Sequence, residues 1–189
     1  MKYFKKLVGE RIYLSPKGAS DEEIEKFTKW MNDFQVSDYI GRSGEITTLL
    51  GEKEWLENSA KNIESRSFNI IDLKNDKLVG TIGLERFNWI ARSAVLGIFI
   101  GDEDYRNNGY GTEAIKLLLE YGFKYLNLHS IRLDLISVNE RAQKRCTANP
   151  VLCRSIGFNA RKLTEERYNN QVLTKRLEDF YNKFADAAL

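Results

Sequence analysis

The sequence predicts an α/β domain, and three observations support this fold class. The chain has 189 residues, a length typical of one domain, so we expect residues 1–189 to form a single domain. Hydrophobic residues make up 42% of the chain, which is enough for one sizeable core. Segments with strand-like alternation are interspersed with segments whose apolar residues recur every three or four positions, as in amphipathic helices.

The first part of the chain predicts one strand followed by two helices. Glu10–Ser15 alternates in the way that strands do. Ser20 followed by Glu23 forms a capping box, so a helix should follow through about Asn32. A second helix is predicted from about Thr48 to Ile63.

The middle of the chain predicts three successive strands, then a helix, a fourth strand and a further helix. The third of these strands is apolar on both faces, as expected of a strand at the centre of a sheet. The helix that follows it has a continuous apolar side. In chain order these elements are Phe68–Leu73, Leu78–Phe87, Ala94–Ile100, Gly111–Asn127, Ser130–Ser137 and Asn139 to about Ala148.

Charge and cysteine content exclude several classes of protein. The chain has 29 basic and 27 acidic residues, so we expect no nucleic-acid partner. The N-terminus lacks a signal-peptide stretch and no apolar run is long enough to span a bilayer, so we expect no membrane partner. Two cysteines, Cys146 and Cys153, and one histidine form neither a disulfide framework nor a zinc pattern. We therefore expect a cytoplasmic protein without a metal site.

The most informative segment is the glycine-containing loop Arg106–Thr112, which lies between an apolar strand and an amphipathic helix. Gly109 and Gly111 allow successive backbone N–H groups to point toward one centre, and the helix N-terminus adds its positive dipole end. Such a cradle binds a pyrophosphate, and Arg106 could add one charged contact. The alternative is an ordinary glycine turn. Neither Gly-Lys-Ser/Thr nor G-x-G-x-x-G is present, which argues against a nucleotide-triphosphate loop and a Rossmann site.

Arg106-x-x-Gly109-x-Gly111 resembles the [Gln/Arg]-x-x-Gly-x-[Gly/Ala] motif of GNAT-type N-acetyltransferases. The surrounding order is also similar, with a strand, the loop, a Gly-Thr-Glu-Ala helix, another strand and Asn139-Glu140-Arg141-Ala142. The opening Val8–Leu14 and the segment Trp30–Asp33 resemble the branch that includes bacterial ribosomal-protein alanine acetyltransferases. The resemblance covers about residues 8–143. It implies a mixed, strongly twisted sheet of about six to seven strands with helices on both faces.

The resemblance also implies acetyl-CoA as cosubstrate, bound in a gap between the strands near Leu96–Ile100 and Ile131–Ile136. The alternative for the strand residues is a place in the core, and for Asn139 a role as helix N-cap. The implied contacts are the main chain of Ile98, Phe99 and Ile100 for the pantetheine arm, the amides of Arg106, Asn107, Asn108, Gly109, Tyr110, Gly111 and Thr112 for the pyrophosphate, and Asn139 from the far side.

The implied reaction is direct attack of a primary amine on the thioester in a ternary complex. The acceptor would be a protein N-terminus, a polyamine or another small amine. Glu85 is the candidate base, with a solvated strand-end carboxylate as the alternative. Many relatives carry a carboxylate just before the glycine of the reactive strand, where this chain has Leu96, and this difference favours a water relay. A main-chain N–H at Phe99 or Ile100 is the expected donor to the oxyanion.

The proton donor to the leaving thiolate is a tyrosine in the family, and this chain departs from that pattern. Matching from Gly157-Phe158 places Cys153 at the tyrosine position, whereas counting forward from Asn139 places Cys146 there. A buried structural cysteine is the alternative. A GNAT-fold regulatory module that binds CoA without turnover is therefore the second hypothesis for function.

The charges are unevenly distributed along the chain. Residues 19–65 contain eleven acidic and five basic side chains, a net charge of −6, which leaves +8 for the remainder. In the family the first two helices border the acceptor, so an acidic surface there would suit a cationic amine. The alternative is an ordinary solvated helix surface. A homodimer is possible because dimers are common among relatives.

Overall fold

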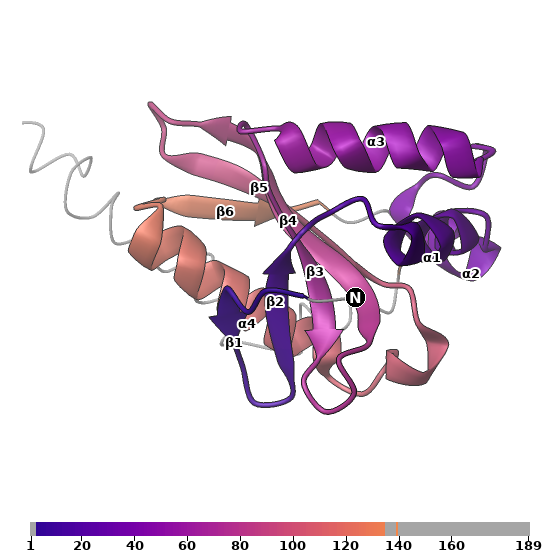
Figure 1. The fold of residues 1–189 in the computed structure, drawn as a ribbon. Coiled ribbons are helices and arrows are strands. Elements are labelled where there is room, and N and C mark those ends of the chain that lie inside the picture. Colours follow the sequence, from indigo (N-terminus) through magenta and orange to yellow (C-terminus); the bar gives the residue numbers. More distant parts are fainter. Residues whose placement is uncertain (1–2, 135–138, 140–189) are drawn as a thin grey trace, which may run out of the picture.

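The computed structural model describes residues 3–134 and Asn139. Its six strands form one sheet in the order β1 to β6 (Figure 1). Neighbouring strands are antiparallel, except that β5 and β6 are parallel. The predicted mixed, strongly twisted sheet is confirmed, with six strands in the described part. These strands are β1 Leu7–Val8, β2 Ile12–Pro16, β3 Arg66–Asp72, β4 Leu78–Asn88, β5 Ser93–Ile100 and β6 Ser130–Leu133.

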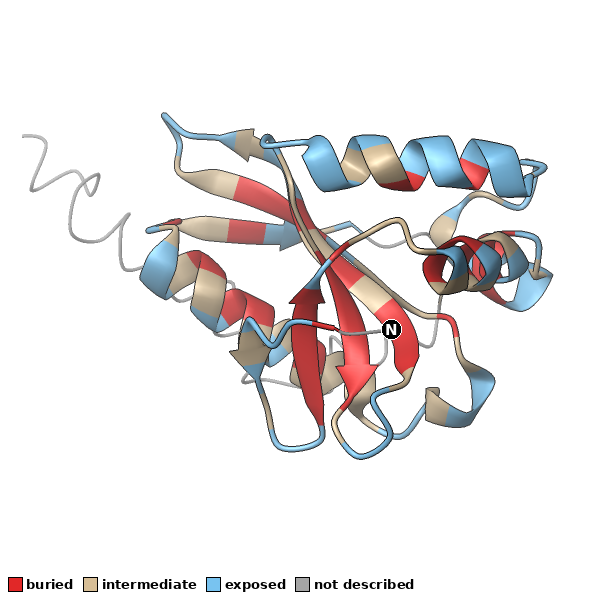
Figure 2. Cartoon of the chain, in the orientation of Figure 1, coloured by how far each residue is buried: buried red, intermediate tan, exposed pale blue. Residues whose placement is uncertain are grey.

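Helices cover both faces of the sheet, as predicted (Figure 1). On one face, α1 Asp21–Met31, α2 Phe34–Ile40 and α3 Leu49–Lys61 enclose a core of aromatic and aliphatic side chains. On the other face, α4 Tyr110–Glu120 packs on a second, larger core. Buried residues follow the middle of the strands and the inner side of the helices (Figure 2). The short turns η1 Glu103–Tyr105 and η2 Tyr121–Tyr125 flank α4.

The start of α1 illustrates how local sequence fixes an element. The Ser20 side chain accepts a hydrogen bond from the Glu23 N–H, and the Glu23 carboxylate accepts one from the Ser20 N–H at 2.9 Å. This reciprocal capping satisfies two amides that the first turn leaves without helical partners. The predicted apolar side of the helix is buried as expected, through Ile24, Phe27, Trp30 and Met31.

Three features differ from the sequence prediction. The two-residue strand β1 was not predicted. Helix α2 was not predicted, because its seven residues are too few to establish a helical period. It is delimited by Asp33, whose side chain accepts from the Gln35 N–H, and by Gly41 in the left-handed conformation at φ 73°. The helix predicted over Gly111–Asn127 is α-helical only to Glu120 and continues as the π-turn η2.

Several predictions lie outside the described residues. These are the end of the strand over Ser130–Ser137, the helix from Asn139 to about Ala148, and the two candidate acid positions Cys146 and Cys153. Within residues 3–134 and Asn139, no helix is long and apolar enough to cross a membrane. In the same part of the chain, no cluster of three or more His, Cys, Asp or Glu residues is arranged to hold a metal ion.

Candidate active site

The last residues of β5 present some main-chain groups on the side away from β4. The register between β5 and β6 runs to Leu96 and Leu133 within the described residues. Beyond that point the Gly101 N–H donates to Val79 on the β4 side at 3.0 Å, whereas the Ile100 carbonyl accepts from the Arg106 side chain at 3.2 Å. Because main-chain directions alternate along a strand, the N–H and C=O groups of the β5 residues Ile98 and Ile100 point away from β4.

This alternation separates the three predicted contacts on β5. The main-chain groups of Ile98 and Ile100 point away from β4, and both residues line a cavity at the end of β5. Phe99 is paired with Thr81 of β4, and its main-chain groups point toward that strand. The N–H groups of Ile98 and Ile100, rather than that of Phe99, are therefore the candidate donors to an oxyanion.

A cavity of about 180 Å³ lies where β5 ends. It brings together eight of the eleven predicted cosubstrate-binding residues, although they are far apart in the sequence. The other wall of the cavity comes from α2 and η1. The sequence did not indicate this wall, because α2 was not predicted. The predicted residues in the cavity are Ile98, Phe99, Ile100, Arg106, Asn107, Gly109, Gly111 and Asn139, and the residues not predicted are Gln35, Val36, Tyr39, Ile40 and Tyr105.

The N-terminus of α4 opens toward this cavity. Gly109 has φ 85°, a left-handed conformation that a glycine adopts without strain. The first intrahelical bond runs from the Glu113 N–H to the Gly109 carbonyl at 3.0 Å, so the amides of residues 110–112 have no partner within their own helix. A Cβ at Gly111 would lie 3.7–3.8 Å from the side chains of Ile98 and Ile100, which shows that this turn lies directly against β5. The donor set fits an anionic pyrophosphate.

The side chain of Arg106 is used differently from the prediction. It is only 12% exposed and donates to the Gly101 carbonyl at 2.7 Å and to the Gln35 side chain at 3.2 Å. Its own N–H donates to the Glu103 carbonyl at 3.0 Å. Arg106 therefore ties the loop to the end of β5 and to α2. The amides that can hold an anion begin after it.

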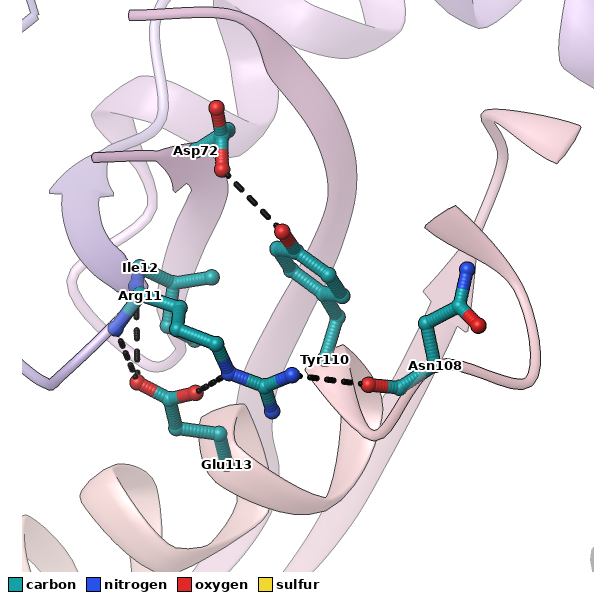
Figure 3. Close-up of polar contacts among 6 residues, drawn as sticks. All are labelled: Arg11, Ile12, Asp72, Asn108, Tyr110 and Glu113. Atoms are coloured by element: carbon teal, nitrogen blue, oxygen red, sulfur yellow. Dashed lines mark hydrogen bonds and ion pairs between the residues drawn. The ribbon is translucent and has the colours of Figure 1, made fainter. Parts of the chain in front are cut away.

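Asn108 and Tyr110 help to position the loop through contacts with Arg11 and Asp72 (Figure 3). The Asn108 carbonyl accepts from Arg11 Nη1 at 2.9 Å, and the same guanidinium lies 4.8 Å from the centre of the Tyr110 ring. The Tyr110 hydroxyl donates to Asp72 at 3.3 Å. These contacts connect the loop to Arg11, which directly precedes β2, and to Asp72 of β3. Of the remaining predicted residues, Thr112 is half-buried in the first turn of α4.

Glu113 anchors the same network. Its carboxylate accepts the Arg11 N–H at 2.8 Å, the Arg11 Nε–H at 3.0 Å and the Ile12 N–H at 3.4 Å. Burial raises the pKa of Glu113, but the hydrogen bonds from Arg11 and Ile12 together outweigh burial and lower it below the usual value. The first turn of α4 is thus fixed to β2 independently of any ligand.

A larger cleft of about 880 Å³ lies on the other side of β5, between α3 and the sheet. It shares Ile40, Ile98 and Phe99 with the smaller cavity, so the two spaces meet at β5. Two paired glycines, Gly83 and Gly97, form part of its floor. A Cβ at Gly97 would have no neighbour within 4 Å among the described residues, so the space above it is open.

Glu85, the candidate base, lines this cleft on the same face of the sheet. It pairs with Val95, which is two residues or about 7 Å along β5 from Gly97. Its side chain is 53% exposed and lies 3.6 Å from that of Arg86. At this separation a proton from an amine above Gly97 would reach the carboxylate through water.

Two ionisable side chains at the inner end of the cleft were not identified from the sequence. Lys17 and Glu52 are both buried and both line the cleft. Burial lowers the pKa of Lys17 to about 8 against the opposing effect of Glu52 and Glu23, and burial raises the pKa of Glu52. Glu52 lies among charged residues at the start of α3, and only the packing of that helix shows that it points inward.

Comparison with known proteins agrees with this geometry. The model of the acetyltransferase (GNAT) domain matches residues 11–148. The probable N-acetyltransferase YjcK of Bacillus subtilis strain 168 is 28% identical over 144 residues, which are 70% of this chain and 76% of that protein. Spermidine N(1)-acetyltransferase of Escherichia coli K12 is 34% identical over 73 residues, 39% of this chain and 38% of that protein.

Solved structures share the fold. Spermidine N-acetyltransferase from Vibrio cholerae, in complex with CoA and spermine, has a TM-score of 0.62 and 22% identity over 71% of this chain and 77% of that chain. An acetyltransferase of the GNAT family from Bacillus anthracis has a TM-score of 0.60 and 24% identity over 80% of this chain and 81% of that chain.

Proposed function

The chain belongs to the GNAT family of acetyltransferases, and on that premise we propose that it transfers the acetyl group of acetyl-CoA to a primary amine. The amine attacks the thioester directly while both substrates are bound. The acceptor is a polyamine, a protein N-terminus or another small amine. Relatives of this chain include spermidine acetyltransferases, which supports an amine as acceptor.

One observation carries this proposal. The small cavity at the end of β5 and the large cleft under α3 share Ile98 and Phe99. A thioester held along β5 from the first side is therefore exposed to an amine that enters from the second. Holding both reactants at one strand makes the attack effectively intramolecular.

The residues of the cavity hold the donor through backbone groups. The amides of residues 110–112 bind the pyrophosphate at the positive end of α4. The main chain of Ile98 and Ile100 pairs with the pantetheine arm, and one of their N–H groups stabilises the oxyanion that forms on attack. Asn139, whose side chain donates to the Tyr39 carbonyl at 3.4 Å, closes the cavity from the far side.

The cleft positions the acceptor and accepts its proton. The amine must be neutral at nitrogen to attack, so a proton leaves before or during bond formation. Glu85 receives this proton through water. The thiolate of CoA leaves with a modest pKa, so its protonation is the least demanding step. The proposed proton donor to the thiolate is Cys153, which takes the tyrosine position when the family pattern is matched from Gly157-Phe158. Cys146, which takes that position when residues are counted from Asn139, is the alternative.

We also propose a cytoplasmic enzyme that acts without a nucleic-acid or membrane partner and that forms a homodimer. The near balance of 29 basic and 27 acidic residues and the presence of only two cysteines support the first part. Sedimentation of the purified chain tests the second, and a single species at the 21.9 kDa of one chain would contradict it.

Turnover is tested by incubating the purified chain with acetyl-CoA and a panel of amines, polyamines and peptides. Free CoA thiol and acetylated product should appear together and only when an amine is present. Binding of acetyl-CoA without release against any amine would instead assign the chain to the regulatory-module class. Failure to bind acetyl-CoA at all would contradict both functions.

A further inference from the structure

The lining of the cleft includes a buried carboxylate with one oxygen that lacks a hydrogen-bond donor among the described residues. Glu52 is 2% exposed, and its Oε1 has no hydrogen-bond partner among the described residues. A buried polar atom without a partner is costly, and native proteins rarely retain one without a reason. Glu52 is also one of the residues that line the cleft, so its carboxylate borders the space that a ligand would enter.

A neighbouring carboxylate shows the contrast. Glu23 is equally buried, but it accepts hydrogen bonds from the N–H groups of Gly18 and Ser20 at 3.0 and 2.9 Å and from the Asn69 side chain. Glu23 therefore has a complete structural role. Glu52 caps no helix, because the N-cap of α3 is Thr48.

The surroundings of Glu52 accommodate an ammonium group. The chain places one of its own there, since Lys17 Nζ lies 4.1 Å from the centre of the Trp55 ring and 4.5 Å from that of Phe27. Aromatic faces attract cations in this way, most strongly where water is excluded. Trp55 itself is partly exposed at the wall of the cleft, so a ligand can reach its ring.

We propose that Glu52, beside the ring of Trp55, binds a second, positively charged group of the acceptor. The preferred substrate is therefore an amine that carries another ammonium group in the same molecule. This inference rests on the proposed acetyl transfer. The reacting nitrogen lies at β5 in its neutral form, while the other nitrogen stays protonated and donates to Glu52 Oε1.

The other charges around Glu52 are compatible with this role. Burial raises the pKa of Glu52, and the charges of Lys17 and Arg42, which face the carboxylate, oppose that shift. The Arg42 Nε–H donates to Glu45 at 2.7 Å, so much of that guanidinium is already engaged. Burial lowers the pKa of Lys17 to about 8, so the ammonium group of Lys17 is held less strongly than that of an exposed lysine.

The test compares 1,4-diaminobutane with butylamine, two acceptors that share a four-carbon chain and differ in the second ammonium group. With acetyl-CoA saturating, we expect kcat/KM of the wild-type chain to be at least tenfold higher for the diamine. Glu52→Gln should lower kcat/KM for the diamine at least tenfold, mainly through KM, and should leave butylamine within twofold.

Glu54→Gln is the matched control, because Glu54 is exposed on the same helix and undergoes the same change of charge. It should leave both amines within twofold. An unaltered KM for acetyl-CoA verifies that the Glu52 variant is folded.

Equal wild-type kcat/KM for the two amines would overturn the inference without the need for any variant. An equal loss for both amines in Glu52→Gln would also overturn it. Absence of CoA release with every amine would contradict the proposed function itself, which is a different result.

Discussion

The carboxylate of Glu113 provides the sharpest test of how the loop before α4 is positioned. Glu113→Gln keeps the size of the side chain, and the amide oxygen can still accept the N–H groups of Arg11 and Ile12. The amide nitrogen, however, now faces the Arg11 Nε–H, which was 3.0 Å from a carboxylate oxygen. The substitution therefore removes one charge-assisted hydrogen bond and the ion pair that accompanies it.

The magnitude follows from the exposure of the two partners. Hydrogen bonds to charged groups contribute about 1.5–3 kcal/mol to the free energy of unfolding. The side chain of Arg11 is 47% exposed and can be rehydrated, so we expect the low end, about 1.5–2 kcal/mol. In a chain of this size that corresponds to a decrease in Tm of about 3–8 °C. The KM for acetyl-CoA should also rise, because Arg11 holds the Asn108 carbonyl as well.

Thermal unfolding monitored by circular dichroism measures the effect, with Glu120→Gln as the matched control. Glu120 lies on the same helix, and its ion pair with Lys124 joins two side chains that are each 62% exposed. Such a pair contributes no more than about 0.5 kcal/mol. A decrease in Tm for Glu113→Gln no larger than that for Glu120→Gln would refute the reasoning.

The pH dependence of this difference has a definite sign. The pKa of Glu113 is lower in the folded chain than its usual value of 4.5. The stabilisation from its charge is therefore complete above pH 4.5 and is lost as the pH falls through the lower, folded pKa. The gap in Tm between wild type and Glu113→Gln should be constant from pH 8 to about 6 and should shrink below pH 4.5.

Three further substitutions test the cleft, the loop and the proton path. Gly97→Val places a side chain in open space, so Tm should not fall, whereas kcat/KM for the amine should drop at least tenfold. Unchanged amine kinetics would show that the acceptor does not bind in the cleft. Arg106→Lys gives up the simultaneous contacts with Ile100 and Gly101, so Tm should fall by about 4–8 °C and the KM for acetyl-CoA should rise; a variant that matches wild type would contradict this positioning role. Glu85→Gln should lower kcat at least tenfold, whereas a change within twofold would leave proton transfer to water alone.

Much of the fold was predictable because its signals are local. The capping box at Ser20 and the apolar spacing behind it determine α1 without reference to the rest of the chain. The glycine at position 109, with its positive φ, marks the start of α4 in the same local way. The order of these elements, rather than any single one, indicated the family. The cosubstrate-binding residues that the resemblance implied could therefore be named, and eight of them line one cavity.

What the sequence did not reveal depends on tertiary packing. Helix α2 has only two turns, so its place in the cavity wall follows from its contact with β5 and not from periodicity. Arg106 lies in a motif associated with phosphate, yet its guanidinium reaches the carbonyls at the end of β5 because that strand ends beside it. Glu52 has exposed charged neighbours, and only the packing of α3 against α1 distinguishes it from them.

The meeting of the two spaces at Ile98 and Phe99 is tested most directly by initial-velocity kinetics. Rates are measured while acetyl-CoA and 1,4-diaminobutane are varied independently. Direct transfer requires both substrates to be bound at β5 together, so double-reciprocal plots should intersect, and the protein incubated with acetyl-CoA alone should keep its mass. Parallel lines together with an acetylated protein would show a covalent intermediate and would contradict the account.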